Sequence, residues 1–296
     1  MVWVISMASF LHELTTDDLT QLNETHKQAA LNALEHEQII FLPNYFFKHD
    51  AQASILFNEN LLDKRHKNLS FNHKNQQLKG QAAPEIHVQT ALKTFLDAFA
   101  CFSHDLISRL LPLYAPYLQW GRTSYRPIEI EQRLTSKRQD DTRLHVDAFP
   151  TTPVQGRRIL RVFCNINPYA APRIWHTGES FTAVLDHFAH KLSSYQPALA
   201  HLLKWTMMTK GLRTAYDHYQ LKLHDAMKES DAYQQHAPKQ LIHFPAHSTW
   251  IVFTDQVSHA ALKGQYVLEQ TFYLPTCYMQ EPKCSPYAHW QARNVI

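Results

Sequence analysis

Glycine is scarce in this chain, and its distribution excludes two large classes of nucleotide-binding site. The 296 residues include six glycines, and no two of them are separated by a single residue. The Gly-x-Gly core of dinucleotide-binding loops is therefore absent, and so is the spacing of a phosphate-binding Walker loop. The sequence also lacks any run of about 20 apolar residues, which is the length that a membrane-spanning helix requires.

Cysteine is equally sparse, and its spacing excludes common sulfur-based motifs. The four cysteines are Cys101, Cys164, Cys277 and Cys284, and no pair of them forms Cys-x-x-Cys. A zinc ribbon and a thioredoxin-like motif are thereby excluded, and free thiols in a reducing compartment are expected. Cys277 and Cys284 combined with His289 would still leave a metal ion short of ligands.

The N-terminal segment does not have the pattern of an export signal. The first ten residues, MVWVISMASF, are mostly apolar, but no basic segment precedes them and no clear cleavage site follows. We therefore expect no signal peptide and a cytoplasmic location. Met1 and Met7 are both candidates for the first residue of the protein.

Charge of one sign is not in large excess. Lys and Arg number 29 against 26 Asp and Glu, which gives a formal net charge of +3. This balance is too weakly basic to indicate a nucleic-acid partner, so none is expected, although anionic ligands are tolerated. The residue type in clear excess is histidine, with 20 copies, and histidine is both an acid–base group and the commonest metal ligand.

The hydrophobic pattern predicts an α+β fold in a single domain spanning residues 1–296. Helical periodicity is expected in an N-terminal part, about 1–120, and in an insert, about 180–235. Short β-branched and aromatic segments predict a β core, about 121–178 and 240–275, that forms an antiparallel sheet or sandwich. In detail, helices are predicted at 16–37 and 87–117, loops and short helices at 50–86, and strands at 39–42, 123–131, 144–149, 158–166, 174–177, 240–244, 249–254 and 265–274.

One His-x-Asp motif stands in a predicted strand. His145 and Asp147 are two residues apart, so in a strand both side chains point to the same face. A neutral imidazole and a carboxylate aimed at one point form part of a metal site. The motif alone has little specificity, because such a pair also arises by chance or as a structural hydrogen bond.

A third candidate ligand follows a second predicted strand. His259 comes after the apolar segment 249–254 and a turn. If the two strands are neighbours, His145, Asp147 and His259 form a triad that holds Fe(II) on one side and leaves positions open for a 2-oxo acid and O2. The alternative is that each histidine is a core residue with an ordinary hydrogen-bonding partner. The run DHFAH at 186–190 is interpreted as a helix surface.

Three arginines near the motif are candidates for binding carboxylates. Arg161 lies within the apolar segment 158–166, and it is the best candidate for the distal carboxylate of a 2-oxo diacid because a guanidinium binds carboxylate through two donors. Its alternative role is a salt bridge to a glutamate. Arg126 and Arg173, the latter close to Trp175, are candidates for binding cosubstrate or substrate, or else ordinary structural arginines.

Five motifs follow one another along the predicted β core. They are RLHVDAFP at 143–150, GRRILRVFCNINP at 156–168, RIW at 173–175, SHA at 258–260 and LEQTFYLP at 268–275. In this order they resemble the Kdo 3-hydroxylase family, which comprises Fe(II)- and 2-oxoglutarate-dependent oxygenases of Gram-negative bacteria. The resemblance covers most of the chain and is densest at about 123–178 and 247–275.

The resemblance implies a double-stranded β-helix, or jelly roll, and hydroxylation of C3 of a Kdo sugar in lipopolysaccharide, with Fe(II), 2-oxoglutarate and O2. It assigns iron binding to His145, Asp147 and His259, and the cosubstrate and substrate pocket to Arg126, Arg161, Arg173 and Trp175. The implied partner is a Kdo-bearing lipid, with transient contact at the inner membrane, and the oligomeric state is left open. The alternatives are a 2-oxoglutarate-dependent hydroxylase of a peptide or small molecule, and a non-catalytic metal-binding protein with the same fold.

Overall fold

The computed structural model describes residues 10–296 apart from 50, 64, 83–84 and 131–135. Met1, Met7 and the last residue of the strand predicted at 123–131 lie outside the described residues. The strands are β1 (Leu11–Glu13), β2 (Ile39–Leu42), β3 (Leu69–Asn72), β4 (Gln77–Lys79), β5 (Gln119–Arg126), β6 (Arg158–Asn165), β7 (Arg173–Thr177), β8 (Gln240–Phe244), β9 (Ser248–Phe253), β10 (His259–Lys263) and β11 (Val267–Leu274). The α-helices are α1 (Thr16–Thr20), α2 (Glu24–Glu35), α3 (Ile86–Leu110), α4 (Phe181–Phe188), α5 (Pro197–Trp205), α6 (Ala215–Glu229), α7 (Asp231–His236) and α8 (Pro286–Ala292).

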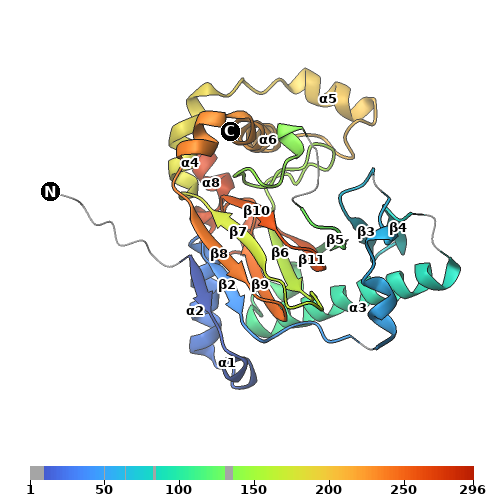
Figure 1. The fold of residues 1–296 in the computed structure, drawn as a ribbon. Helices are drawn as coiled ribbons and strands as arrows, with labels where there is room; N and C mark the ends of the chain where they lie inside the picture. The colour runs from blue at the N-terminus through green and yellow to red at the C-terminus, as the bar shows by residue number, and fades with distance from the viewer. Residues whose placement is uncertain (1–9, 50, 64, 83–84, 131–135) are drawn as a thin grey trace.

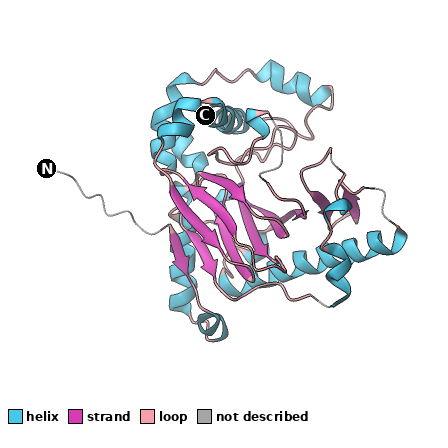
Figure 2. Cartoon of the chain, viewed as in Figure 1, coloured by secondary structure: helices cyan, strands magenta, loops and turns pink. Residues whose placement is uncertain are grey.

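Two sheets form the centre of the molecule, and Figure 2 shows their strands gathered between the helices. The larger sheet has the strand order β1-β2-β9-β6-β11-β5-β3-β4, and the smaller sheet has the order β10-β7-β8. An aromatic cluster that includes Phe163 of the larger sheet and Trp175 of the smaller sheet lies between them. Two facing, mainly antiparallel sheets with supporting helices confirm the predicted α+β jelly-roll fold.

Helices α2 and α3 cover the outer face of the larger sheet. Leu34 of α2 and Ile107 of α3 belong to one buried cluster with Leu160 of β6 and Ile251 of β9. Figure 1 shows α3 crossing the lower part of this sheet. No helix in the described chain combines the length and the apolar character needed to cross a bilayer.

The helical insert packs beside the His-x-Asp segment. Leu144 and Val146 are fully buried in a cluster with Phe181 of α4 and with Leu223 and Met227 of α6. The apolar side chains of this segment therefore point into the insert. Because side chains alternate along an extended chain, those of His145 and Asp147 point the opposite way.

The N-terminal part differs from the prediction in its strands and in the division of its first helix. The helix predicted at 16–37 is divided into α1 and α2, because the Asn23 side chain accepts a hydrogen bond from the His26 backbone N–H (3.0 Å) and starts a new helix. The segment 50–86, predicted as loops and short helices, also contains the hairpin of β3 and β4. With β1, which was not predicted either, the N-terminal part contains three strands that the sequence analysis missed, besides the predicted strand β2.

The β core differs from the prediction at the metal motif. Residues 144–149 were predicted as a strand, but they form only a single antiparallel bridge, between His145 and His259. His259 itself begins β10, a strand that the sequence did not predict. The strands predicted at 39–42 and 240–244 coincide with β2 and β8. The single-domain organisation stays a prediction.

Candidate metal centre

The segment that carries His145 and Asp147 is held by backbone hydrogen bonds to both sides of one turn. The N–H of His145 donates to the carbonyl oxygen of His259 (3.0 Å), and that of Asp147 donates to the carbonyl oxygen of Thr254 (2.7 Å). Thr254 and His259 flank the turn between β9 and β10. The extended conformation of the His-x-Asp segment is thus fixed although it is not part of a regular strand.

The side chains of His145, Asp147 and His259 converge on one buried point. One candidate ligand atom from each lies within 4.8 Å of the other two. The distance from His145 Nε2 to Asp147 Oδ1 is 3.7 Å, and the ring centroids of the two histidines are 4.6 Å apart. The relative exposures are 5%, 8% and 5%. Of the three groups of potential metal ligands found among the described residues, this is the one whose members are all buried.

Hydrogen bonds fix the tautomer of both imidazole rings. His145 Nδ1 lies 2.7 Å from the carbonyl oxygen of Arg143, and His259 Nδ1 lies 2.9 Å from that of Val257. A carbonyl oxygen only accepts hydrogen bonds, so each Nδ1 carries the proton and each neutral ring presents an Nε2 lone pair. A backbone carbonyl in this role is the usual outer partner of a metal-binding histidine.

The protonation states of the triad suit a cation. Burial lowers the pKa of His145 well below 6.5 and also lowers that of His259, so both rings are neutral near pH 7. Burial alone would raise the pKa of Asp147, but its pKa is below the usual value, and the positive charge of Arg161 is the first cause of the lowering. Two neutral nitrogen donors and one carboxylate match the ligand set of a facial Fe(II) triad.

Trp175 forms one wall beside His259. β7 pairs with β10 so that Thr177 lies opposite His259. The Trp175 ring stacks on the His259 ring, with a centroid distance of 5.1 Å and an interplanar angle of 24°. Trp175 is 1% exposed, and this contact restricts the orientation of the imidazole.

Arg161 and Arg126 already have acidic partners. Arg161 Nη2 lies 3.2 Å from Asp147 Oδ2, and its Nη1 lies 3.0 Å from Glu269 Oε1. Arg126 contacts Glu269 Oε2 and Asp141 Oδ2, both at 3.3 Å. The salt bridge to a glutamate, which was the alternative role of Arg161, is therefore present, and Arg161 also touches the triad itself.

Arg173 has no acidic partner among the described residues that form ion pairs. Its Nη1 donates to the carbonyl oxygen of Gly264 at 2.8 Å, and the side chain is buried. Burial, together with the nearby charge of Arg126, lowers the pKa of Arg173 to about 9. A buried guanidinium without a carboxylate is costly unless an anion joins it.

Four buried N–H donors around this site make no hydrogen bond with any described residue. They are Arg126 Nε, Arg161 Nε, Arg173 Nε and Trp175 Nε1. Buried polar atoms in proteins nearly always have partners, so these donors beside the triad are available to a ligand rich in acceptors. A cation held by the triad and an oxygen-rich anion beside it fit the residues present.

Two acidic residues of the site were missed by the sequence analysis. Glu269 is 3% exposed and links Arg126 to Arg161. Asp141 joins Arg126 to Lys67 and to the buried Lys228. Glu269 stands in an apolar strand, where a buried charge requires a partner, and this was the available signal.

Comparison with known proteins identifies the family. The family model described as 3-deoxy-D-manno-oct-2-ulosonic acid (Kdo) hydroxylase matches residues 17–292. No curated protein sequence matches the chain significantly.

Among solved structures, the chain is similar to the Kdo hydroxylase KdoO, described as a non-heme Fe(II) alphaketoglutarate dependent dioxygenase. The KdoO complex with cobalt(II) has a TM-score of 0.92 and 38% sequence identity, and the match covers 97% of this chain and 96% of KdoO. The complex with alphaketoglutarate and Fe(III) has a TM-score of 0.91 at 38% identity and covers 96% of each chain. The chain therefore belongs to the Kdo hydroxylase family.

Proposed function

We propose that this chain hydroxylates C3 of a Kdo sugar carried by a lipid, using Fe(II), 2-oxoglutarate and O2. The observation that carries the proposal is the buried convergence of His145, Asp147 and His259, with both Nε2 atoms unprotonated. Such a triad leaves half of the coordination positions of Fe(II) open. Complexes of the relative KdoO with alphaketoglutarate and with succinate support the choice of cosubstrate.

The chain contributes metal binding, orientation and a dry environment. When bound, Fe(II), 2-oxoglutarate and O2 supply an oxidation that releases succinate and CO2 and inserts one oxygen atom into a C–H bond. His145, Asp147 and His259 hold the iron. Arg161 lies 3.2 Å from Asp147 Oδ2 and keeps that carboxylate ionised and oriented. The burial of all these groups excludes bulk water from the reacting atoms.

Arg173 is the arginine best placed to bind a carboxylate of the cosubstrate or of the Kdo sugar. It shares one face of β7 with Trp175, because the two residues are two positions apart, and both have an unpaired buried N–H. Arg126 and Arg161 are held by Glu269 and complete the pocket as positioning groups. A guanidinium binds a carboxylate through two parallel donors.

A surface of the insert fits contact with an anionic bilayer, which would present a lipid-borne substrate. We define the α5 surface as Leu199, Leu202, Trp205, Met207 and Met208, all of which are exposed, with Trp205 at 81% and Met207 at 88%. Residues 196–213 contain no acidic side chain but include Lys204 and Lys210. Apolar and aromatic side chains beside lysines are typical of helices that lie in a membrane interface. Figure 1 shows α5 at the upper edge of the molecule.

The α5 surface is connected to the loop that follows the His-x-Asp motif. The backbone N–H of Lys210 donates to the carbonyl oxygen of Thr151 (2.9 Å), and Arg213 Nη2 donates to that of Pro150 (2.7 Å). Membrane contact at α5 would thus act on a segment that is hydrogen-bonded to the loop beside the metal centre. A cytoplasmic location with transient contact at the inner membrane belongs to this proposal.

Succinate release tests the proposed function. The purified chain is loaded with Fe(II) and incubated with 2-oxoglutarate and O2, with and without a Kdo-bearing lipid. We expect succinate in amounts equal to hydroxylated lipid. Succinate that appears only with a peptide or a small molecule would contradict the substrate assignment, and metal binding without any 2-oxoglutarate consumption would contradict the enzyme assignment.

A further inference from the structure

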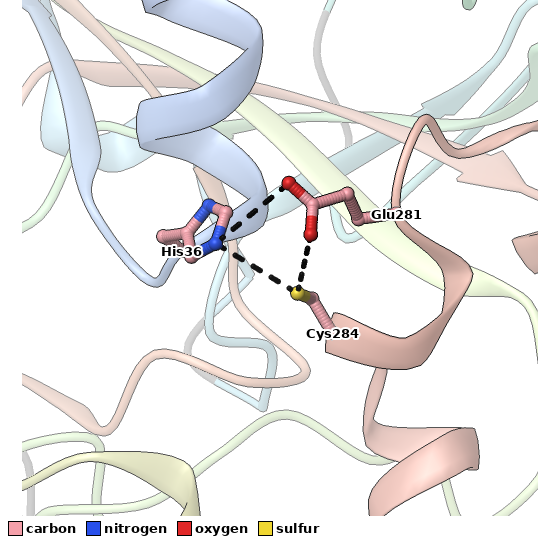
Figure 3. Close-up of side chains that lie close together, drawn as sticks. All are labelled: His36, Glu281 and Cys284. Atoms are coloured by element: carbon pink, nitrogen blue, oxygen red, sulfur yellow. Dashed lines mark hydrogen bonds and ion pairs between the residues drawn. The ribbon is translucent and has the colours of Figure 1, made fainter.

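A second group of metal-binding side chains lies on the surface, away from the catalytic triad. It consists of His36, Glu281 and Cys284, which come from opposite ends of the chain. His36 directly follows α2, and Cys284 ends the short helix η7 (Pro282–Cys284). Figure 3 shows the three side chains pointing toward one another between these two segments.

The two segments are fastened together beside this group. Glu35 is 1% exposed, and its carboxylate accepts hydrogen bonds from the backbone N–H groups of Gln280 (2.8 Å) and Glu281 (2.7 Å). The Tyr114 hydroxyl donates to the same carboxylate at 2.5 Å. Because Glu35 precedes His36, these bonds fix the backbone around Glu281 next to the imidazole. Backbone hydrogen bonds therefore help to bring the side chains of His36 and Glu281 together.

The distances within the group are close to those of a zinc site. His36 Nε2 lies 3.9 Å from Glu281 Oε1 and 3.9 Å from Cys284 Sγ, and Cys284 Sγ lies 3.9 Å from Glu281 Oε2. Neighbouring ligand atoms in a tetrahedral zinc site with ordinary bond lengths are roughly 3.3–3.6 Å apart. The His36–Glu281 distance is too long for a hydrogen bond, and the two Cys284 Sγ contacts are at the outer limit of weak sulfur hydrogen bonds. The two contacts of Glu281 use different carboxylate oxygens, and one ligand atom from each residue lies within 4.8 Å of the other two. Rotation of the Glu281 side chain that brings one oxygen toward both partners would accommodate an ion.

The donor chemistry selects a borderline-soft divalent cation. His36 Nδ1 lies 2.9 Å from the carbonyl oxygen of Asn32, so Nδ1 carries the proton and Nε2 is available as a ligand. A thiolate, an imidazole and a carboxylate together suit Zn²⁺ and do not suit Mg²⁺ or Ca²⁺. The Lys283 ammonium lies 3.3 Å from Glu281 Oε2 but is 82% exposed, and a surface ion pair of this kind is weak.

A second surface group offers a contrast within the same chain. His73, Asp97 and Cys101 also lie close together. There the His73 Nδ1 atom is 2.5 Å from Asp97 Oδ1, which is a direct hydrogen bond. The carboxylate oxygen is already occupied by the ring, so the group is satisfied without an ion.

We propose that His36, Glu281 and Cys284 bind Zn²⁺, with the fourth coordination position open to water. The ion would join the end of α2 to the segment preceding α8, and so connect two regions separated by most of the chain. Closing so long a loop stabilises the folded state by restricting the unfolded chain. This inference goes beyond the proposed function and does not depend on it.

Cobalt(II) substitution of the full chain tests the site, because thiolate ligation gives Co²⁺ an intense ultraviolet charge-transfer band that the sulfur-free catalytic triad cannot give. We expect this band in the wild-type chain, in Asp147→Ala and in the matched control Cys101→Ser, and its loss in Cys284→Ser. Zn²⁺ should raise the unfolding temperature of Asp147→Ala, and this shift should disappear when Cys284→Ser is added. Far-UV circular dichroism confirms that the variants are folded.

Absence of the band from the wild-type chain, its persistence in Cys284→Ser, or its loss in Cys101→Ser would overturn the proposal. Failure of the proposed function has a different signature. In that case succinate would not form although the sulfur band is present, whereas failure of the zinc site alone would leave succinate formation without the band.

Discussion

His145 and His259 exchange backbone hydrogen bonds across an isolated bridge, with N···O distances of 3.0 and 2.9 Å. This exchange fixes the two backbones directly opposite each other and brings the ring centroids to 4.6 Å. The same segment then places Asp147 Oδ1 3.7 Å from His145 Nε2. The register of a single bridge therefore sets the geometry of the whole triad.

Replacing Arg173 tests its proposed role in anion binding. Removing one partner of a buried charge pair costs ~2 kcal/mol or more, so Arg173→Ala should raise the KM for 2-oxoglutarate or for the Kdo lipid by at least about 30-fold. Arg173→Lys should restore only part of this loss, because an ammonium lacks the two parallel donors. Steady-state kinetics with each substrate varied in turn measures both values and shows which carboxylate Arg173 binds. Unchanged KM values in Arg173→Ala would exclude it as an anchor.

Glu269 should be important for stability because it pairs with the buried Arg161 and with Arg126, whose side chain is 15% exposed. Glu269→Gln leaves Arg126 and Arg161 without their shared carboxylate, and breaking a buried ion pair in this way costs about 3–5 kcal/mol. The matched control is Glu229→Gln, which removes only a surface partner of Arg138 and should cost less than about 1 kcal/mol. Urea unfolding of the metal-free chain measures both, and equal losses would refute the role of Glu269.

The buried histidines predict a pH dependence of the metal-free chain. The pKa values of His145 and His259 are lowered from 6.5 by burial, whereas the unfolded chain keeps the ordinary value. Below about pH 6.5 the unfolded state thus binds more protons, so the free energy of unfolding falls as the pH falls, by up to about 1.4 kcal/mol per pH unit for each ring.

Urea unfolding at pH 7.5 and 5.5 measures this effect. The double variant His145→Gln/His259→Gln should lose less stability between the two pH values than the wild-type chain does. The variant His190→Gln changes an exposed ring and should behave as the wild type. An identical pH dependence in the double variant would show that these rings do not titrate as the structure indicates.

The α5 surface should mediate binding to anionic membranes. Replacing Trp205 and Met207 together with serine should weaken binding to phosphatidylglycerol-containing vesicles at least about tenfold, because each buried apolar side chain contributes about 1.5–3 kcal/mol. Tyr169→Ser is the matched control, since Tyr169 is 73% exposed and lies in the turn after β6. Vesicle co-sedimentation measures the effect, and equal binding by all three proteins would exclude this surface.

Sequence periodicity predicted two kinds of element. In one kind the side chains are buried on both faces, and in the other buried and exposed side chains alternate along the strand. The strands at 39–42 and 240–244 are examples. The two-residue spacing of His145 and Asp147 predicted that their side chains share one face, and the structure brings the two together although residues 144–149 do not form a regular strand. The division at Asn23 depends on a single cap, which leaves little trace in a hydrophobic pattern. β3 does alternate the fully buried Leu69 and Phe71 with polar residues, but a signal of four residues beside the mostly polar β4 is short, and the sequence analysis missed it.

The acidic partners of the arginines in the site could not be predicted from the residues that neighbour them in the sequence. Arg161 meets both Asp147 and Glu269 because β6 pairs with β11 and the His-x-Asp segment lies against the β9–β10 turn. Both contacts join segments that are far apart in the sequence. The burial of Arg173 without a described carboxylate likewise follows from packing against Gly264 and not from its neighbours in the chain.

Anaerobic titration with Fe(II) in the presence of 2-oxoglutarate tests the central claim most directly. The wild-type chain and the surface control His190→Ala should both develop the weak metal-to-ligand charge-transfer band of the ternary complex, saturating at one iron per chain. Asp147→Ala and His259→Ala, verified as folded, should not develop it. A band of wild-type intensity and affinity in His259→Ala would contradict the assignment of His145, Asp147 and His259 as the iron-binding triad.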